Sequence, residues 1–543
     1  MGLTKKHLKC LKKNELIEII LRQQKDIQAL QKQMIVLQEN IQTQQEIIQQ
    51  LRDEIARLKG HNSKPKIKPS NMDKGTEQKA KEIHPSVKRA GSEKRSKTKE
   101  IVIHHEETIS PIDPLPLDAE FKGYKKYVVQ GLRFCAHNTL YKLERWKLSD
   151  GKYATGQLPD AIKGKHFDPQ LEQYVLYQYH HCNVTQPLIL EQLHEIGIDI
   201  SSGQINRILT EGHEVFHQEK DAVYRTGVDV SEYLTVDDTS CRHQGKNGYT
   251  THIGSALFAW FSSTRSKSRI NFLELLQQSG NQGYQITEYA LAYMKEKKLK
   301  NSIMQALKCH ALSSFASKEL WEAHMISLDI HSERHVQIVT EGALIGQILS
   351  DGILNDMTIV SDDAGQFNIL VHALCWIHAE RTIHKLHPLN DAHQVVIDSI
   401  RTEIWDYYAD LKLYKQSPNA EIKATLDKRF DEIFTQKTGY KTLNESLKRL
   451  DKNKAELLMV LDQPQIPLHT NDSERDIRGV VGKRKVSGGT RSDPGQRARD
   501  TFASLKRTCR RNAISFWNYL GDRLLRTNNI PPLPQIIRQN VAA

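Results

Sequence analysis

The sequence predicts a multidomain α+β protein whose N-terminal part forms a coiled coil. Its 543 residues correspond to three or four domains at roughly 100–200 residues each. Near the N-terminus, apolar residues recur every seven positions. Farther along, short apolar runs of strand length end in carboxylates, and helical periods separate these runs. We therefore expect several helical and strand-containing units along the chain.

The composition favours a basic protein of the cytosol with a polyanionic partner. Hydrophobic residues make up 38% of the chain, and no apolar run reaches the ~18 residues of a membrane span. The first residues lack the apolar core of a secretory signal, and Gly2 is not followed by an acylation motif. Seven cysteines occur without a C-x-x-C pair, which indicates reduced thiols. The net charge of +12 favours nucleic acid as the partner.

Residues 1–60 are predicted to form a coiled-coil dimerisation helix. The a positions are Ile20, Ile27, Met34, Ile41, Ile48 and Ile55. The d positions include Leu30, Leu37, Leu51 and Leu58. Isoleucine at a with leucine at d favours parallel two-stranded coils, so we expect a homodimer or a higher homo-oligomer. The alternative is one amphipathic helix that packs on its own protein.

Two segments of different character follow the coiled coil. Residues 61–100 are rich in Lys, Ser, Pro and Gly and predict a basic, disordered linker. Residues 101–165 predict a small β module, with strands at 127–129 and 140–146 before the turn at Ser149–Gly151. Cys135 is the one cysteine of this module, so we expect no structural zinc there.

Residues 166–228 predict a helical domain with a helix-turn-helix. An apolar helix face runs from Leu188 to Leu193, Gly197 breaks it, and Ser201 or Ser202 caps the next helix. The polar residues expected on the exposed face of that second helix are Gln204, Asn206 and Arg207. These three are candidate DNA-binding residues. The alternative is an ordinary helical hairpin.

Three carboxylates occupy positions suited to metal chemistry. Asp237 ends an apolar strand over 233–236, and Asp362 ends another over 357–361. Glu474 lies where a helix begins. Carboxylates from two strand ends and one helix can form the set of hard oxygen ligands that Mg²⁺ prefers. Two such ions about 3.5–4 Å apart stabilise both the attacking and the leaving oxygen of a displacement at phosphorus.

Each carboxylate also has a structural interpretation. An aspartate at a strand end often belongs to turn chemistry. Asn471 at an N-cap with Glu474 three residues later approximates a capping box, and Glu474 can pair with Arg478 one helical turn away. The neighbouring Asp238 and Asp363 are not candidate ligands.

Four motifs together resemble the insertion-sequence-66 family of transposases. The most specific is N-D-S-E-R-D-I-R-G-V-V-G-K-R-K-V-S-G-G-T-R-S, over 471–492. The others are V-D-D-T at 236–239, V-S-D at 360–362 and C-W-I-H-A-E-R at 375–381, in the family's order. The resemblance covers most of the chain and is specific mainly from Leu234 onward.

The resemblance implies an RNase H-like α/β catalytic core over 229–383 and 466–515, with a helical insertion at 384–465 and a C-terminal helix and tail at 516–543. Asp237, Asp362 and Glu474 would be its DDE triad, both catalytic and metal-binding. The implied cofactor is a pair of Mg²⁺ ions, for which Mn²⁺ can substitute. Cys375 and His378 are too few to form a zinc site, and we expect a buried thiol and a hydrogen-bonded histidine.

The implied function is a DNA transposase that binds the terminal inverted repeats of its own mobile element and catalyses cleavage and strand transfer. The resemblance further implies a bacterial, cytoplasmic protein that joins the nucleoid when bound to DNA, without a membrane partner and with small accessory proteins of the same element as further partners. Basic residues near the triad are candidate phosphate contacts: Arg475, Arg478, Lys483, Arg484, Lys485 and Arg491, with Arg507, Arg510 and Arg511 behind them.

Three alternatives stay open at this point. The basic residues could form a solvated face. The chain could be a non-catalytic repressor derived from a transposase, or an RNase H-like nuclease that only hydrolyses DNA. The presence of all three carboxylates argues against the repressor. The coiled coil and the helical domain fit the pairing of two DNA ends better than simple hydrolysis.

Overall fold

The computed structural model describes residues 103–109, 124–125, 128–159, 162–309, 313–352, 357–388 and 390–542. They belong to one compact unit, Arg95–Ala543. The predicted coiled coil of 1–60 and the basic linker of 61–100 lie outside these residues. Helices and a mixed sheet confirm the predicted α+β class. No helix in the described part of the chain is long and apolar enough to cross a membrane.

The predicted β module is smaller than the sequence indicated. Its strands are β1 (Arg145–Lys147) and β2 (Tyr153–Thr155), which pair antiparallel around a turn containing Gly151 at φ +82°. The strand predicted over 140–146 is therefore confirmed only at its end, and residues 128–129 belong to no strand. The physical reason is exposure, because a strand is stabilised by packing one face and both of these strands are exposed throughout.

Among the described residues, four helices precede the central sheet: α4 (Pro169–His180), α5 (Gln186–Glu195), α6 (Ser202–Thr210) and α7 (Glu214–Val230). Gly197, at φ +83°, lies in the turn between α5 and α6. Ser201 is the N-cap of α6, and its hydroxyl accepts a hydrogen bond from the backbone of Gln204. The two-helix arrangement predicted for this segment is therefore present.

The central sheet has the order β5-β4-β3-β8-β9. Its strands are β3 (Tyr233–His243), β4 (Lys246–Gly254), β5 (Ala259–Thr264), β8 (Thr358–Ser361) and β9 (Val371–Leu374). The first three are antiparallel, whereas β8 and β9 run parallel to β3.

The strand predicted to end at Asp237 continues to His243, so Asp237 lies inside β3. The extension is stable because a tight hairpin leads directly into β4, which keeps the backbone of this segment paired. Gln244 and Gly245 form that turn with φ values of +50° and +75°. Two successive positive φ values characterise the hairpin turn that matches the twist of its strands.

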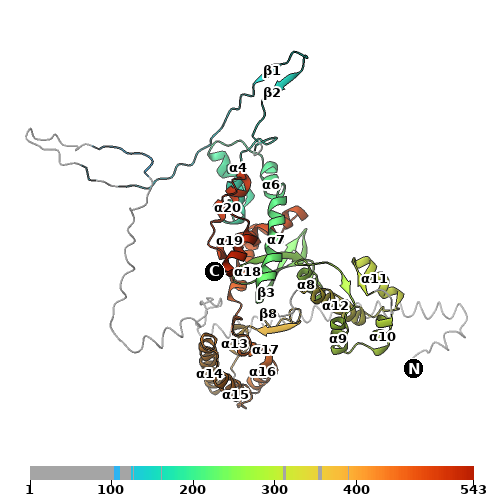
Figure 1. The fold of residues 1–543 in the computed structure, drawn as a ribbon. Helices are drawn as coiled ribbons and strands as arrows, with labels where there is room; N and C mark the ends of the chain where they lie inside the picture. The colour runs from blue at the N-terminus through green and yellow to red at the C-terminus, as the bar shows by residue number, and fades with distance from the viewer. Residues whose placement is uncertain are drawn as a thin grey trace, which may run out of the picture. The chain divides into compact units, whose positions relative to one another are not determined.

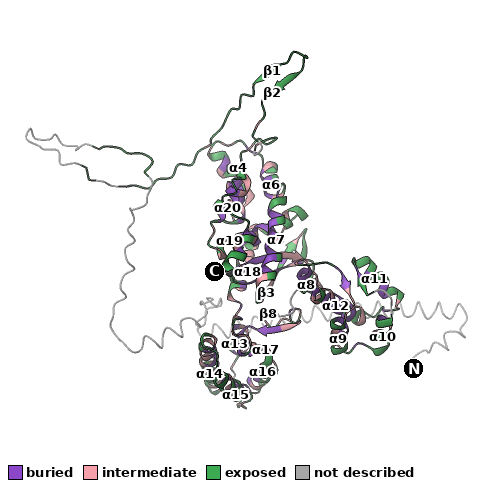
Figure 2. Ribbon diagram, in the orientation of Figure 1, coloured by how far each residue is buried: buried purple, intermediate pink, exposed green. Residues whose placement is uncertain are grey.

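Helices cover both faces of the sheet (Figure 1). Along β5, alternate side chains point to opposite faces. Trp260 stacks on Tyr224 of α7 with ring centroids 4.2 Å apart. Phe261 instead packs with Ile477 of α18 (Asn471–Ser487) and Ala503 of α19 (Asp493–Arg511). Thus α7 covers one face, whereas α18 and α19 cover the other. Figure 2 shows buried residues along these helices where they meet the strands.

Helix α19 also covers the edge of β5. The outward backbone N–H groups of β5 donate to side chains on α19 instead of to another strand. The pairs are Ala259 to Thr508 Oγ1 at 3.2 Å, Phe261 to Ser504 Oγ at 2.9 Å and Ser263 to Asp500 Oδ2 at 2.7 Å. The acceptors on α19 are four residues apart, which is a rise of about 6 Å along the helix. The donors on β5 are two residues apart, which is about 6.6 Å along the strand, so donors and acceptors have nearly the same spacing.

Two long insertions separate elements of the central sheet and its helices along the sequence. Between β5 and β8 lie α8 (Arg269–Gln277), β6 (Tyr284–Gln285), α9 (Glu288–Glu296), α10 (Asn301–Cys309), β7 (Ser314–Phe315), α11 (Lys318–Ser327) and α12 (Glu333–Ser350). Between β9 and α18 lie α13 (Trp376–His384), α14 (Asp391–Gln416), α15 (Ala420–Phe434), α16 (Lys441–Lys452), α17 (Lys454–Leu457) and η1 (Met459–Leu461). The helical character predicted for 391–461 is confirmed. The division into domains stays a prediction.

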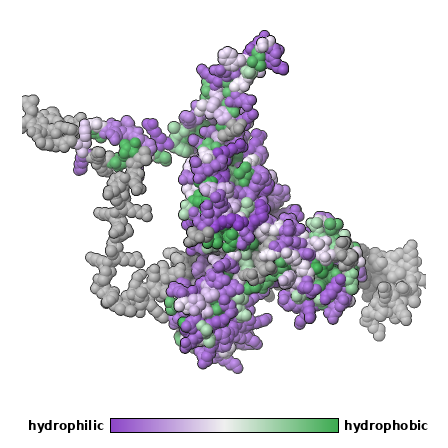
Figure 3. Space-filling model, in the orientation of Figure 1, coloured by the Kyte–Doolittle hydropathy of each residue, from purple (hydrophilic) through white to green (hydrophobic). Residues whose placement is uncertain are grey.

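The chain ends with α20 (Phe516–Leu525), which packs on α4, and α21 (Leu533–Ala542), which packs on α7. Hydrophilic residues dominate most of the described surface on the face in Figure 3.

Candidate active site

Asp237 lies in β3, and Asp362 is the residue directly after the neighbouring strand β8. Thr235 of β3 pairs with Val360 of β8 in a parallel register, which is the last pair between the two strands. Continued two residues farther along both chains, this register brings Asp237 level with Asp362, whose charge acts on Asp237. Residues level with one another on neighbouring strands point to the same face, and the strands are about 4.8 Å apart. The register therefore brings two carboxylates together.

The shared face is the one that α18 covers. The side chain of Thr235 points to the same face as Asp237, because the two are separated by two residues. The hydroxyl of Ser473, in the first turn of α18, donates to Thr235 Oγ1 at 2.7 Å and is fully buried. This contact fixes the first turn of α18, with Glu474 as the next residue, over the strand that carries Asp237.

The electrostatics of the aspartate pair are those of a site that lacks positive charge. Burial raises the pKa of Asp237 to about 7, and the negative charge of Asp362 acts in the same direction. The backbone N–H of Asp238, which donates to Asp237 Oδ1 at 2.8 Å, and the side chain of His378 lower this pKa less strongly. At neutral pH the Asp237 carboxyl is therefore close to half protonated in the absence of a cation.

Glu474 is held by two arginines. Its carboxylate accepts hydrogen bonds from Arg381 Nη1 at 3.0 Å and from Arg478 Nη2 at 2.9 Å. Burial raises the pKa of Glu474, but Arg381, His378 and Arg478 lower it more, so the net shift is downward. Glu474 is therefore ionised at neutral pH, in contrast to Asp237.

The structure decides between the two structural interpretations of Glu474. The N-cap of α18 is Thr470 and makes no side-chain cap hydrogen bond, so Asn471 and Glu474 do not form a capping box. The pair of Glu474 with Arg478 four residues later is present. Glu474 thus starts the helix without capping it, and its carboxylate is directed to the arginines.

His378 is a member of the site that the sequence analysis treated as structural. Its Nε2 lies 3.5 Å from Glu474 Oε1, and its charge also acts on Asp237. The nearby Cys375 is buried, as predicted, and accepts a hydrogen bond from the backbone of Thr470 at 3.4 Å. The signal was available in the sequence, because His378 and Arg381 are three residues apart and therefore share one helix face.

Asp238 and Asp363 have side-chain partners outside the three carboxylates, and burial, with a smaller contribution from the charge of Asp362, raises the pKa of Asp238. Asp238 points to the opposite face of β3 and accepts a hydrogen bond from Gln366 Nε2 at 2.7 Å. Asp363 forms an ion pair with Arg449 of α16. Both therefore have partners of their own.

The donor set suits a hard divalent cation, because all three candidate ligands are carboxylates and the aspartate pair lacks a counter-charge. However, no group of three His, Cys, Asp or Glu side chains within the described ranges is arranged to hold a metal ion. Glu474 pairs with Arg381 and Arg478 instead. Coordination by all three carboxylates requires the Glu474 side chain to exchange these arginines for the metal.

Most of the predicted phosphate contacts of the α18 region are exposed. Arg475, Arg478, Lys485 and Arg491 have exposed side chains. Arg484 is half-buried and donates to Ser240 Oγ at 2.9 Å. Lys483 differs from the others, because it is 8% exposed and its ammonium donates to the backbone carbonyl of Tyr179 at 2.6 Å.

On α6, Asn206 and Arg207 are exposed, whereas Gln204 is half-buried. Arg207 Nη1 lies 3.5 Å from Gln204 Oε1. The helix therefore presents two of the three predicted DNA-binding side chains to solvent.

Comparison with known proteins places these residues in a family. The family described as "Transposase IS66 family" matches residues 315–498, a segment that contains Asp362 and Glu474. The uncharacterized protein y4jO of Sinorhizobium fredii (strain NBRC 101917 / NGR234) is 41% identical over 314 residues, which cover 57% of this chain and 98% of that protein. The uncharacterized protein y4qI of the same organism is 26% identical over 162 residues, 28% of this chain and 30% of that protein.

The chain belongs to the transposase IS66 family. This confirms the resemblance drawn from the motifs. It is accordingly a transposase by family.

Proposed function

We propose that this transposase cleaves the terminal inverted repeats of its own element and joins the freed 3′ ends to target DNA, with Asp237, Asp362 and Glu474 as the catalytic, metal-binding carboxylates. The observation that carries the proposal is the register that puts Asp237 level with Asp362, beneath the helical turn that contains Glu474. The mixed sheet, with Asp237 in β3 and Asp362 directly after the adjacent parallel strand β8, supports an RNase H-like core.

The reaction has two displacements at phosphorus. In the first, water attacks the phosphodiester at the end of the element, and the strand leaves as a 3′-hydroxyl. In the second, this hydroxyl attacks a phosphodiester of the target, a new P–O bond forms and a target 3′-hydroxyl leaves. A pair of Mg²⁺ ions, or Mn²⁺ in their place, supplies the charge that stabilises the attacking and leaving oxygens.

The residues around the carboxylates have distinct roles. Asp237 and Asp362 supply two adjacent oxygen donors on rigid strands, and their mutual repulsion is relieved when a cation binds. Arg381 and Arg478 hold Glu474 ionised and ready for exchange. Since both are cationic, they can turn to a DNA phosphate when Glu474 leaves them.

DNA recognition is divided between two surfaces. The exposed basic residues of α18 and the following turn contact phosphates, which positions the DNA without reading its sequence. Asn206 and Arg207 of α6, with Gln204, contact bases. Dimerisation through residues 1–60 brings two element ends into one assembly, with small accessory proteins of the element as further partners.

The test is cleavage and strand transfer on a labelled element end with Mg²⁺, comparing wild type with Glu474→Gln. Glutamine keeps the size and hydrogen-bonding shape of glutamate but removes the charge that a metal needs. Glu445→Gln, the same change at an exposed position of α16, is the matched control. We expect loss of cleavage and joining by at least about 100-fold in Glu474→Gln alone, with DNA binding retained.

The other outcomes separate the alternatives. A Glu474→Gln variant as active as wild type would show that Glu474 is structural. Wild-type protein that cuts without joining would be a hydrolytic nuclease. Wild-type protein that binds the ends and never nicks them would be a repressor.

A further inference from the structure

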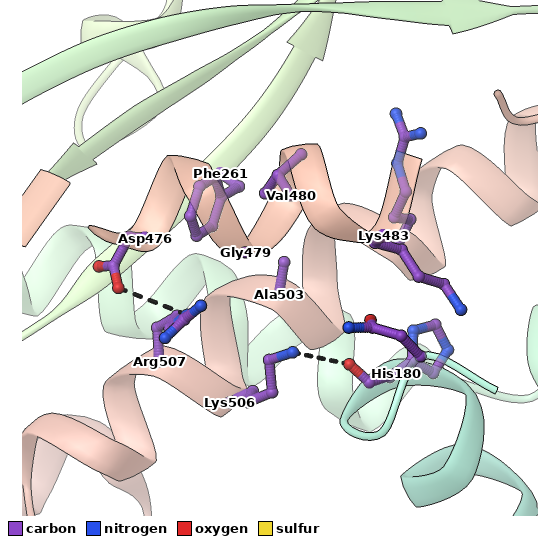
Figure 4. A pocket seen from close by; sticks show the side chains of 11 residues that line it. His180, Phe261, Asp476, Gly479, Val480, Lys483, Ala503, Lys506 and Arg507 are labelled. Carbon is purple, nitrogen blue, oxygen red and sulfur yellow. Dashed lines mark hydrogen bonds and ion pairs between the residues drawn. The ribbon is translucent and has the colours of Figure 1, made fainter. Parts of the chain in front are cut away.

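A basic pocket lies between α18, α19 and the C-terminal end of α4 (Figure 4). Its polar walls are formed by His180, Asn183, Lys483, Arg499, Lys506 and Arg507, and we call it the α18/α19 pocket. In Figure 4 the side chains of Lys483 and Lys506 approach His180 from the two helices. None of the proposed catalytic carboxylates lines it.

The pocket carries an excess of positive charge. Its lining contains four basic side chains, Lys483, Arg499, Lys506 and Arg507, and one carboxylate, Asp476. Asp500 lies 3.9 Å from Arg499 outside the lining, so basic groups outnumber carboxylates even when it is included. The Asp476 carboxylate is already engaged, because it lies 3.4 Å from Arg507 and 2.6 Å from Arg511.

The pKa values of the two lysines reflect this excess of basic groups. Burial and neighbouring cations lower the pKa of Lys483 to about 7 and that of Lys506 to about 8. Buried like charges without counter-ions are costly, so the pocket favours an anion.

The two lysines also cap the end of α4. Lys483 donates to the carbonyl of Tyr179 at 2.6 Å and Lys506 to the carbonyl of His180 at 2.7 Å. A helix C-terminus accounts for about half a negative charge, which is far less than the excess here. Each ammonium has three donors. The ammonium of Lys483 also lies 3.3 Å from the centre of the Tyr179 ring, so Lys506 has more N–H groups left for another acceptor.

A buried histidine completes the polar lining. His180 is 7% exposed, and its Nε2 has no hydrogen-bond partner among the described residues. Burial and the nearby Lys483 lower the pKa of His180 well below its ordinary value, so the ring is neutral. A neutral imidazole protonated at Nε2 donates a hydrogen bond, which an anionic oxygen would accept.

The pocket depends on a glycine in α18. A Cβ on Gly479 would lie 2.0 Å from Arg507 Nη2. The absence of a side chain at Gly479 therefore makes room for the guanidinium of Arg507 against α18.

We propose that the α18/α19 pocket binds one phosphate of the DNA backbone. The proposal rests on the proposed function and adds a site to it. Helix α18 carries both Glu474 and Lys483, nine residues apart, which is about 13 Å along the helix and half a turn around it, so their side chains leave the helix on opposite sides. With a helix diameter of about 10 Å, the two positions are roughly 17 Å apart. At roughly 3.4 Å of rise per nucleotide, a strand that crosses α18 from the carboxylates brings a phosphate about five nucleotides away to the pocket.

The first experiment uses inorganic phosphate as the probe on the full-length protein. Thermal unfolding is followed in phosphate and in chloride at equal ionic strength, for wild type, Lys506→Met and Lys220→Met. Lys220 is a matched control, because it is a buried lysine that lies outside the pocket and over the Trp260 ring. We expect phosphate to raise the melting temperature of wild type and Lys220→Met, and to leave Lys506→Met unchanged.

The second experiment replaces single backbone phosphates of the element end by neutral methylphosphonates and measures binding in EDTA. For wild type, we expect one position about five nucleotides from the cleavage site to weaken binding by about 10-fold. The same replacement has no further effect on Lys506→Met. The salt dependence of wild-type binding exceeds that of Lys506→Met by about one unit of log K against log [salt].

The outcomes are distinguishable from failure of the proposed function, because neither experiment requires cleavage. If phosphate raises the melting temperature of wild type but no methylphosphonate replacement weakens DNA binding, the pocket holds a free anion. That result overturns the DNA proposal. Absence of both effects would mean that the lysines only cap α4. If Lys506→Met does not fold, Lys483→Met replaces it in both experiments. The methylphosphonate scan on wild type then also tests the proposal by itself, because a scan in which no position weakens binding overturns it.

Discussion

The perturbed ionisation of Asp237 predicts how the stability of the metal-free protein depends on pH. In the unfolded chain this carboxyl ionises near its ordinary pKa of 3.8, whereas in the folded protein it keeps its proton until about pH 7. As pH rises between these values, the unfolded state releases the proton first and gains stability relative to the folded state. A group with a raised folded pKa therefore contributes stability at low pH that is lost by pH 8.

The magnitude follows from the shift. About three pKa units correspond to roughly 4 kcal/mol at high pH, as an order of magnitude. At pH 5 part of this cost is already present, so the change between pH 5 and pH 8.5 is roughly 2–3 kcal/mol. Asp237→Asn removes the titrating group and keeps the side chain's shape. The variant should therefore gain stability over wild type by this amount as the pH increases from 5 to 8.5.

The assay is urea unfolding of both proteins in EDTA at several pH values, followed by tryptophan fluorescence, since Trp260 and Trp376 are buried. Asp363→Asn, the same change at a surface carboxyl that pairs with Arg449, is the control. If the difference in the free energy of unfolding between Asp237→Asn and wild type stays constant over this pH range, Asp237 and Asp362 do not form one buried pair. Mg²⁺ should stabilise wild type at pH 8.5 and have a smaller effect on Asp237→Asn.

Two further predictions concern the helices that complete the site. Gly479→Ala should lower the stability by about 1–3 kcal/mol in thermal unfolding, because the new Cβ displaces Arg507. Gly482→Ala, in open space on the same helix, should instead raise the stability by about 0.5–1 kcal/mol. If both substitutions change the stability equally, Arg507 does not pack against Gly479. Ser504→Ala should cost about 1–3 kcal/mol by leaving the Phe261 N–H unsatisfied, and hydrogen exchange should show that amide exchanging faster. Unchanged exchange would exclude the contact.

The elements around the site could be predicted because their signals are local. Apolar runs predicted a strand at Asp237 and a strand that ends at Asp362, and the structure has β3 through Asp237 and β8 up to Ser361. The cap at Ser201 marked the start of α6. The same local reasoning ended the first strand too early. Its outer half is polar and is held by the hairpin with β4, and a hairpin turn formed by Gln244 and Gly245 was not recognised.

The partners of Glu474 could not be predicted in the same way. Arg381 is 93 residues away in the sequence, and no periodic pattern connects two residues across such an insertion. The capping box looked plausible because its spacing is correct, but the N-cap is Thr470 instead of Asn471, and the Glu474 carboxylate pairs with arginines. Ion pairs between distant segments depend on tertiary packing, which sequence spacing does not encode.

The β module shows the opposite limitation. Residues 140–146 have the alternation and aromatic content of a strand, yet most of them lie outside β1. Alternation indicates which side chains could share a face, but it does not supply a surface to cover that face. In this segment Leu140 is 81% and Trp146 66% exposed, so the pattern lacks the partner that would give it stability.

The way α19 covers β5 has a consequence for biosynthesis. Ala259 and the Thr508 hydroxyl that accepts its N–H are 249 residues apart. At roughly 5–20 residues per second, the ribosome needs about 12–50 s to make the chain between them. Throughout that interval the β5 edge of the nascent chain has unpaired N–H groups, and for most of it Glu474 has not yet been made. The β5 edge is covered and the third proposed catalytic carboxylate is added late in translation, so a chain truncated before α18 would be prone to aggregation and would lack that carboxylate.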